Sequence, residues 1–452
     1  MLRSERWNSL SLFVGRGCRY CYGCLGSNVW ITGYAATVQA VEELYSGSRT
    51  TVDGQRIQCL TRTMNLKEAI AELTPSLIEM RRDFHRHPEL GFQEVRTSGK
   101  LADFLEGLGL EVTRGVAQTG VVASLKGVKP GKTVLVRADI DALPITEDSG
   151  VEYSSQTPGV MHACGHDGHA AIAAHVAAVL ARFRDRIAGE VRFAFQPAEE
   201  IVSGALPMVE AGVLDGVDSV VGLHLYSLMP AGKVGVRPGP SMAAADAFTI
   251  HLRGKGAHAA MPHEGVDTVL MASQIIVALQ SLVSRETDPI HTSVITIATV
   301  SAGDGAHNII PETAELKGTL RTFDAGLREK LMRRIGELSE GIAAAMGGRA
   351  EVTWLRGSPA VVNDPVMVER FREVARQVVG DQSVLEVPPV MGGDDMSEFL
   401  NRRPGVYFWL GAGDPDPSKN RAHHHPGFWI DDERSLPLGT ELITRTVLDF
   451  LR

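Results

Sequence analysis

TVLVRADI, residues 133–140, is an apolar run that ends in charged residues, which is typical of a buried strand in a parallel sheet. Working outward from it, AAIAAHVAAVLARF (170–183) predicts a helix and EVRFAFQPAEE (190–200) predicts a strand that runs into a polar loop. A further strand is expected at SVVGLHLY (219–226). This alternation predicts an α/β domain with a mixed, largely parallel sheet and helices packed on its faces.

A second pattern begins near Ser241. Its expected elements run strand, helix, strand, strand, helix, strand, which is the order of a ferredoxin-like α+β unit. The α/β pattern returns at residue 357. We therefore expect one domain made of residues 64–240 and 357–452, with a smaller domain inserted at 241–356, and a ligand-binding cleft between the two.

Residues 1–63 differ from the rest of the chain. They hold Cys18, Cys21, Cys24 and Cys59 but none of the 15 histidines, so the cysteine spacing lacks the partners of a zinc knuckle. A helical apolar period starts only after Met64. We expect residues 1–63 to be a disordered extension and Met64 to be the functional start.

Composition excludes several classes of function. With 44% hydrophobic and 22% charged residues the chain is globular, and a net charge of −9 without a basic block argues against nucleic acid as a partner. No apolar run reaches the roughly 18 residues that span a membrane. Beyond residue 63 only Cys164 remains, which favours a reducing, cytoplasmic location over a disulfide scaffold.

The densest chemical signal is MHACGHDGH, residues 161–169. Five potential metal ligands fall within eight positions, and the glycines allow a tight turn before an apolar helix. Each histidine taken singly is more simply explained by ordinary hydrogen bonding. A thiol together with several imidazoles nevertheless forms a donor set suited to a transition metal.

Further polar residues follow predicted strands. Gln196-Pro197-Ala198-Glu199-Glu200 places two carboxylates side by side, which is costly unless a cation lies near one of them. His224 lies inside an apolar strand, and a run of three histidines begins at His423. Asp139 and Asp141 follow a buried strand and suit the orientation of metal ligands by hydrogen bonds.

In this order the motifs resemble the amidohydrolase branch of the zinc carboxypeptidase and aminoacylase superfamily. That branch contains hippurate hydrolases, N-acyl-amino-acid amidohydrolases and plant enzymes that release indole-acetic acid from amino-acid conjugates. The resemblance runs from about Met64 to the C-terminus through the motifs RRDFHRHPELGFQE, RADIDALP, MHACGHDGHAA, QPAEE, GLHLY, GKGAHAAMPHEGVD and HHHPGF.

The resemblance implies two divalent metal ions per subunit and a hydrolase that cleaves the amide bond of N-acyl amino acids. It implies that Glu199 is the general base. The ligand positions that it implies are Cys164, His166, Glu200, His224 and His424. His423 and His425 stay open as alternatives to His424, and the bridge between the ions is open between the Cys164 thiolate and water.

In the inserted domain, the resemblance implies that His258 stabilises the oxyanion and that Asn308 and Arg321 bind the substrate carboxylate. The planar guanidinium of Arg321 suits a bidentate contact with a carboxylate. Gly393-Asp394-Asp395-Met396 departs from the Glu-Asp-Phe step of many relatives, and the shorter Asp394 is expected to change local support or substrate fit.

Alternatives remain at this stage. A dipeptidase or carboxypeptidase of the same superfamily would share the metal ligands, whereas a non-catalytic metal- or amino-acid-binding protein would have no use for Glu199. Manganese and zinc are the expected ions, with cobalt and nickel also compatible with the donors. The resemblance also implies a homodimer formed through the inserted domain.

Overall fold

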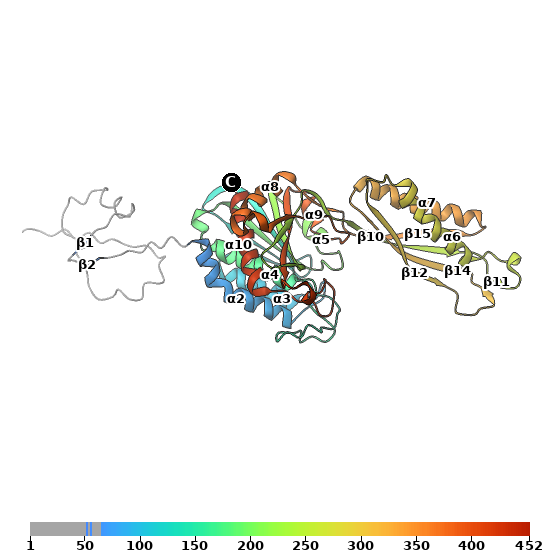
Figure 1. Cartoon of the computed structure of the whole chain (residues 1–452), viewed down its shortest axis with the longest axis horizontal. Coiled ribbons are helices and arrows are strands. Elements are labelled where there is room, and N and C mark those ends of the chain that lie inside the picture. The colour runs from blue at the N-terminus through green and yellow to red at the C-terminus, as the bar shows by residue number, and fades with distance from the viewer. Residues whose placement is uncertain (1–50, 53–54, 57–64) are drawn as a thin grey trace, which may run out of the picture. The chain divides into compact units, whose positions relative to one another are not determined.

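The computed structural model describes residues 51–52, 55–56 and 65–452 (Figure 1). The chain divides into two units, Met1–Thr63 and Met64–Arg452. In the first unit, β1 (Thr51–Val52) pairs antiparallel with β2 (Gln55–Arg56). The other residues of 1–63, including the four cysteines, lie outside the described residues, so the disorder expected there stays a prediction.

The second unit contains an eight-stranded sheet in the order β17-β8-β18-β7-β5-β6-β4-β3. Its four middle strands, β18, β7, β5 and β6, are mutually parallel, while antiparallel pairs occur toward both edges. The mixed, largely parallel sheet is therefore confirmed. The strands are β3 (Glu111–Val116), β4 (Gly120–Lys126), β5 (Lys129–Asp139), β6 (Ala188–Gln196), β7 (Ser219–Pro230), β8 (Val234–Val236), β17 (Val384–Glu386) and β18 (Gly405–Gly413).

Both faces of this sheet are covered, as the apolar strands predicted. Along β5, Val134 and Val136 join one core cluster while Leu135 joins another, because successive side chains of a strand point to opposite faces. The helices of this part are α2 (Leu66–Arg86), α3 (Val95–Gly107), α4 (His166–Ala181), α5 (Ala205–Glu210), α8 (Pro365–Val379), α9 (Ser397–Leu400) and α10 (Asp432–Phe450), with 3-10 turns η1 (Arg184–Arg186), η4 (Asp381–Ser383) and η5 (Pro417–Lys419).

Helix α4 is the central helix of this layer. Every residue from His166 to Leu180 is buried, and the helix contacts α2, α10 and the sheet. Its sequence is apolar on all sides, as a fully enclosed helix requires. At its first turn a Cβ on Gly168 would lie 2.4 Å from Leu225 Cδ1, so any larger residue there would have to displace the Leu225 side chain from between α4 and β7.

A four-stranded antiparallel sheet has the order β12-β14-β10-β15. In chain order its elements are β10 (Ala244–Arg253), α6 (Thr268–Ser281), the π turn η3 (Leu282–Glu286), β12 (Ser293–Ala302), β14 (Thr313–Thr322), α7 (Ala325–Ala345) and β15 (Arg349–Leu355). This is the predicted strand and helix order. The two helices and one sheet face enclose a separate apolar cluster that includes Phe248, Ile275 and Leu331.

Short elements flank this sheet. They are β9 (Gly239–Met242), which pairs with β16 (Val361–Asn363), β11 (Ala257–His258), which pairs with β13 (Ile309–Ile310), and the 3-10 turn η2 (Pro262–Glu264). The helical stretch Thr268–Glu286 is long and apolar enough to meet a membrane-span criterion, with a third of it buried. Met271, Ile275 and Leu279 form its buried side, so packing on the sheet accounts for much of that apolar character.

Candidate metal centre

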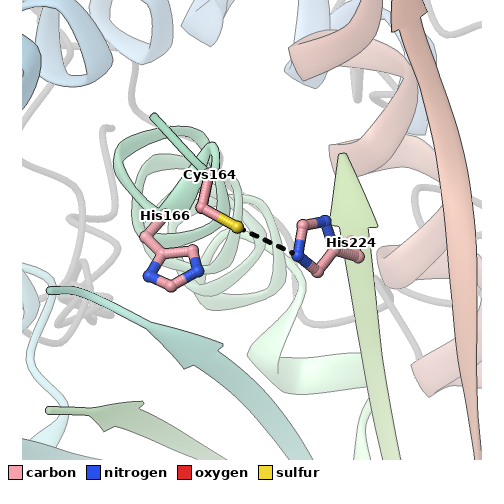
Figure 2. Close-up of side chains that lie close together, drawn as sticks. All are labelled: Cys164, His166 and His224. Carbon is pink, nitrogen blue, oxygen red and sulfur yellow. Dashed lines mark hydrogen bonds between the residues drawn. The ribbon is translucent and has the colours of Figure 1, made fainter. Parts of the chain in front are cut away.

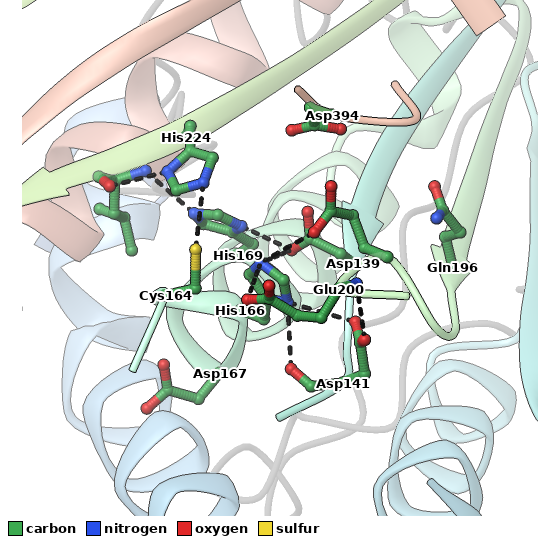
Figure 3. Close-up of polar contacts among 12 residues, drawn as sticks. Asp139, Asp141, Cys164, His166, Asp167, His169, Gln196, Glu200, His224 and Asp394 are labelled. Atoms are coloured by element: carbon green, nitrogen blue, oxygen red, sulfur yellow. Dashed lines mark hydrogen bonds and ion pairs between the residues drawn. The ribbon is translucent and has the colours of Figure 1, made fainter. Parts of the chain in front are cut away.

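The candidate centre lies where β5, β6 and β7 deliver polar residues beside the start of α4 (Figure 3). β6 ends at Gln196, three residues before Glu199, and β7 carries His224. Gly165 precedes α4 with φ +92°, a left-handed conformation that glycine adopts without strain. This turn places Cys164 and His166 on either side of the helix start.

The five expected ligands come together in overlapping groups of side chains. Cys164 Sγ lies 3.5 Å from His224 Nε2 (Figure 2). Donor atoms lie within 4.8 Å of one another in the sets Cys164–His166–His224, Cys164–Glu200–His424 and His166–Glu199–Glu200. Cys164 and His166 each belong to two of these sets, so the donors converge on one region.

Hydrogen bonds leave suitable lone pairs pointing into this region. His166 Nδ1 lies 3.0 Å from the Asp141 carbonyl oxygen, and His224 Nδ1 donates to the Leu225 carbonyl oxygen at 2.8 Å. Within residues 65–452, His166 Nε2 and Glu200 Oε1 are buried without a hydrogen-bond partner. Leaving such atoms unpaired costs about 1–3 kcal/mol each. A bound cation would satisfy both, so the donor set fits a metal site.

The two adjacent glutamates are in opposite electrostatic states. Burial, together with the charges of Asp394 and Glu200, holds the pKa of Glu199 well above its ordinary value. Burial acts in the same direction on Glu200, but its contact with His424 (3.3 Å from Oε2 to Nε2) and the nearby His166 lower its pKa overall. Glu199 can therefore hold a proton, whereas Glu200 stays ionised as an anionic donor.

A buried arginine pairs with the two aspartates that neighbour Glu199. Arg137 contacts Asp139 at 2.6 Å, Asp395 at 2.9 Å and Asp394 at 3.2 Å. Burial and the neighbouring Asp394 raise the pKa of Asp395 to about 7 even though Arg137 opposes that shift. The Tyr407 hydroxyl donates to Asp394 at 2.7 Å, so the short Asp394 side chain is held on both sides.

The structure separates the three consecutive histidines. His423 is half-buried, and its Nε2 donates to the Leu225 carbonyl oxygen at 2.9 Å. Desolvation lowers its pKa to about 4. His425 Nδ1 accepts from the Gly427 amide. Only His424 of the three reaches Glu200, from a backbone with φ +63° whose amide donates to the Ala163 carbonyl oxygen.

The expected substrate-binding residues belong to none of these donor groups. His258, on β11, is exposed, and its Nδ1 accepts from the Ala260 amide. The Asn308 carbonyl oxygen accepts from the Ala259 amide, which brings the His258 and Asn308 segments together. Arg321, on β14, donates to the Asp246 carbonyl oxygen and to Thr319 Oγ1, and burial lowers its pKa.

Comparison with known proteins identifies the chain. The sequence model described as peptidase family M20/M25/M40 matches residues 135–449. The chain belongs to this family. The amidohydrolase and aminoacylase resemblance seen in the motifs is thereby confirmed.

Relatives of this M20 chain include hydrolases of two kinds. An N-acyl-L-amino acid amidohydrolase of Geobacillus stearothermophilus is 44% identical over 300 residues, covering 66% of this chain and 80% of the relative. Thermostable carboxypeptidase 2 of Saccharolobus solfataricus is 40% identical over 372 residues, covering 81% and 94%. The crystal structure of the Bacillus subtilis YXEP protein, a dinuclear metal-binding peptidase of the M20 family, has a TM-score of 0.74 and 36% identity and covers 84% of this chain and 99% of that chain.

Sequence patterns did not single out every residue that supports this M20 centre. Asp139 was expected to orient a ligand, but besides Arg137 its direct partner is His169, at 2.6 Å, which was a possible donor of the motif but not one of the implied ligands. Asp141 fits its expectation: besides its contact with His166, its carboxylate accepts from the Glu200 amide at 3.0 Å. Arg137 gave no signal except its position in the same strand, two residues before Asp139.

A second buried cluster fastens the start of α4 to α2. Asp167 Oδ2 lies 2.8 Å from Arg81 Nε and 2.7 Å from His85 Nδ1, and Asp167 Oδ1 accepts from the Gly168 amide. Burial would raise the pKa of Asp167, but Arg81 and His85 lower it far below its ordinary value. The carboxylate therefore stays ionised and fixes the turn that carries Cys164.

We predict that Asp167→Asn lowers the free energy of unfolding by about 3–5 kcal/mol at neutral pH, because it removes the charge that buried Arg81 and His85 share and leaves Arg81 only its 3.3 Å contact with Asp432. Since the pKa of Asp167 is lower in the folded state than its unfolded value of about 3.9, this contribution is complete above that value. It is lost as pH falls toward the folded-state pKa, so the deficit should shrink in acid. Urea unfolding at several pH values measures it.

Asp83→Asn serves as the matched control. Asp83 pairs with Arg96 and Lys100 at the partly exposed surface of α2 and α3, where such a contact contributes about 0–1 kcal/mol. Equal losses in the two variants would contradict the role assigned to the buried cluster.

Proposed function

We propose that this M20 protein is a two-metal hydrolase that cleaves the amide bond of N-acyl amino acids, releasing a carboxylic acid and a free amino acid. The observation that carries the proposal is the pair Glu199 and Glu200. One of these buried carboxylates is poised to take up a proton, and the other is held as an anion among thiol and imidazole donors. A G. stearothermophilus relative named for this activity supports the choice of substrate.

The residues that would hold the ions are Cys164, His166, Glu200, His224 and His424. Manganese or zinc is the expected metal, and cobalt or nickel would also suit these donors. When bound, the ions supply an activated water and polarise the substrate carbonyl. Glu200 and Cys164 would contribute the anionic donors.

Glu199 carries the proton transfers. Its carboxylate would take a proton from the attacking water and deliver it to the nitrogen of the leaving amine. A general base works best when its pKa lies near the working pH, and burial beside Asp394 moves the pKa of Glu199 upward in that direction. Asp394 and Asp395, which neighbour Glu199, are held in place by Arg137 and keep that part of the site polar.

Substrate recognition is assigned to the inserted domain, residues 241–356, acting as a lid on the domain formed by 64–240 and 357–452. In residues 65–452 Arg321 has no ion pair with a carboxylate, since the nearby Asp246 carboxylate is bound by Arg328. Its charge is thus available for the free carboxylate of the substrate, alongside Asn308. His258 would stabilise the oxyanion.

A carboxypeptidase or dipeptidase is the second candidate, favoured by the 40% identity to a carboxypeptidase. Both candidates use the same metal ligands and the same contact to a terminal carboxylate. A panel of N-acetyl, N-benzoyl and dipeptide substrates with the metal-loaded protein separates them. A non-catalytic binding protein would turn over none of these substrates.

We also propose a cytoplasmic homodimer that needs neither nucleic acid nor a membrane. β12 is an edge strand of the four-stranded sheet, and an open edge can pair with a second copy. Helix α6 exposes Val269, Leu270 and Val277, which are 50%, 50% and 72% exposed. An apolar helix face next to an open strand edge is a plausible surface for a two-fold contact.

We predict that Glu199→Gln retains both metals but lowers kcat at least about 100-fold, because the amide cannot accept the proton of the attacking water. Elemental analysis and steady-state hydrolysis of an N-acyl amino acid are the measurements. Glu210→Gln, at the end of α5, is the control for loss of an exposed glutamate. Wild-type activity in Glu199→Gln would exclude its role as base.

We predict that Cys164→Ala loses metal and activity together. A thiolate ligand must lose its proton, and burial beside Glu200 raises the pKa of the metal-free Cys164 thiol well above its ordinary value. Metal uptake by the wild type should therefore strengthen as pH rises, and that dependence should weaken in the variant. Full metal occupancy of Cys164→Ala would remove this residue from the ligand set.

We predict that His258 acts in the active site of the partner subunit. Inactive Glu199→Gln and inactive His258→Ala should then regain activity when mixed, because a mixed dimer has one site with both defects and one with neither. Size-exclusion chromatography verifies the dimer, and differently tagged subunits verify exchange. A monomer, or confirmed exchange without activity, would contradict action across the dimer.

A further inference from the structure

His169 lies one turn after His166 on α4, is buried, and is bonded at both ring nitrogens. Its Nδ1 is 2.6 Å from Asp139 Oδ1 (Figure 3). Its Nε2 is 2.9 Å from the Leu225 amide nitrogen. The carboxylate can only accept a hydrogen bond and the amide can only donate one. The proton is therefore on Nδ1, and the Nε2 lone pair is occupied by the Leu225 amide. Although His169 lies beside His166, it has no free lone pair for a metal.

The main chain at Leu225, which is hydrogen-bonded to His169, also contacts the candidate metal ligands. Leu225 directly follows His224 on β7, and its carbonyl oxygen accepts two hydrogen bonds, from His224 Nδ1 at 2.8 Å and from His423 Nε2 at 2.9 Å. The Leu225 peptide units thus orient the His224 ring and anchor the residue before His424. Displacing this main chain would move two expected donors together.

Asp139, which accepts the hydrogen bond from His169, is itself held in place by Arg137. Asp139 Oδ2 accepts from Arg137 Nη1 at 2.6 Å, and both side chains are buried. Because a guanidinium only donates, Asp139 must accept at both oxygens, from Arg137 and from His169. The result is a directed chain of hydrogen bonds from Arg137 through Asp139 and His169 to the Leu225 amide.

We propose that His169 is a positioning residue of the metal centre: held by Asp139 and Arg137, it fixes the Leu225 main chain so that His224 Nε2 faces Cys164 Sγ. This role rests on the proposed function, because it takes His224 as a metal ligand. Residues that orient ligands in this way typically contribute 10–100-fold to metal affinity. His169 should therefore act on metal binding before any effect on chemistry.

Two substitutions of His169 each keep one of its two hydrogen bonds and remove the other. In His169→Asn the amide nitrogen can reach the position of Nδ1 and keep the contact with Asp139, but the Leu225 amide loses its acceptor. In His169→Gln the terminal oxygen can reach the position of Nε2 and keep the contact with Leu225. The matched control is His175→Gln, which alters another buried histidine of α4 whose hydrogen-bond partners in residues 65–452 are Ala171 and Ser76 alone.

Asp139→Asn tests the donor-to-acceptor direction of these hydrogen bonds. Its single oxygen must face Arg137, which only donates, so its amide would face His169 Nδ1 and force the proton to Nε2. Two N–H groups, from His169 and Leu225, would then point at each other. This isosteric change should weaken metal binding as much as His169→Asn does.

The experiment is a titration of metal-free protein with cobalt, followed by the absorption of the bound ion, together with urea unfolding of the metal-free variants. We expect His169→Asn and Asp139→Asn to bind at least one of the two ions about 10–100-fold more weakly, and His169→Gln to lose less than about tenfold. His175→Gln should match the wild type in affinity.

Equal affinities for wild type and His169→Asn would overturn the positioning role. So would equal losses in the Asn and Gln variants, or losses that follow unfolding stability and appear also in His175→Gln. Wild-type protein that binds no cobalt would refute the proposed function itself, and with it this role, whereas tight wild-type binding with unaffected variants would refute the positioning role alone.

Discussion

Many ionisable groups are buried where the central parallel strands β5, β6 and β7 meet the start of α4. Their burial is the constraint on which the rest of the structure depends. Moving a carboxylate out of water costs several kcal/mol unless a positive charge or hydrogen bonds compensate for it. Arg137 compensates for Asp139, Asp394 and Asp395. Near the start of α4, Arg81 and His85 do the same for Asp167. Among residues 65–452 the compensation at Glu200 comes from histidines alone, His424 at 3.3 Å and His166 at 3.8 Å. The absence of an arginine or lysine partner there is the electrostatic reason to place metal ions beside it.

The central strands and the group of candidate donors could be predicted because their signals are local in the sequence. Largely apolar stretches such as 133–140 and 219–226 predicted the central strands. Residues 161–169 indicated a group of possible metal donors, and only the family resemblance singled out Cys164 and His166 among them. The supporting contacts were not predictable, since each joins residues far apart in the sequence, such as Asp139 to His169 and His423 to Leu225. For the same reason sequence alone left His423, His424 and His425 open, because all three share one local environment in the sequence and differ only in what lies across from each.

For the four-stranded sheet, the order of the elements could be predicted from the sequence but the role of Arg321 could not. Its connectivity follows from the order of its apolar periods, whereas Arg321 could not be told from an ordinary strand-end charge. In the structure its guanidinium contacts main-chain and hydroxyl oxygens, and burial lowers its pKa although the charge of Asp246 opposes that shift. The Asp246 carboxylate itself is bound by Arg328. A half-buried guanidinium without a carboxylate partner among residues 65–452 is energetically incomplete, and an anionic substrate group would complete it.

Backbone strain points to the same centre as the charges. Six non-glycine residues in the described part have positive φ, and three of them lie at the centre. Ala198 precedes Glu199, Val202 follows Glu200 by two residues, and His424 is itself an expected ligand. For a β-branched residue such as Val202 this conformation is a true outlier, and each such residue costs about 1–3 kcal/mol. Hydrogen bonds from Val202 N to Glu199 O and from His424 N to Ala163 O hold the strained turns. The turn at 198–203 presents Glu199 and Glu200, so a change in its backbone would redirect both carboxylates relative to the other donors of the centre. Strain of this kind is concentrated at functional sites, which agrees with the roles proposed for these two glutamates.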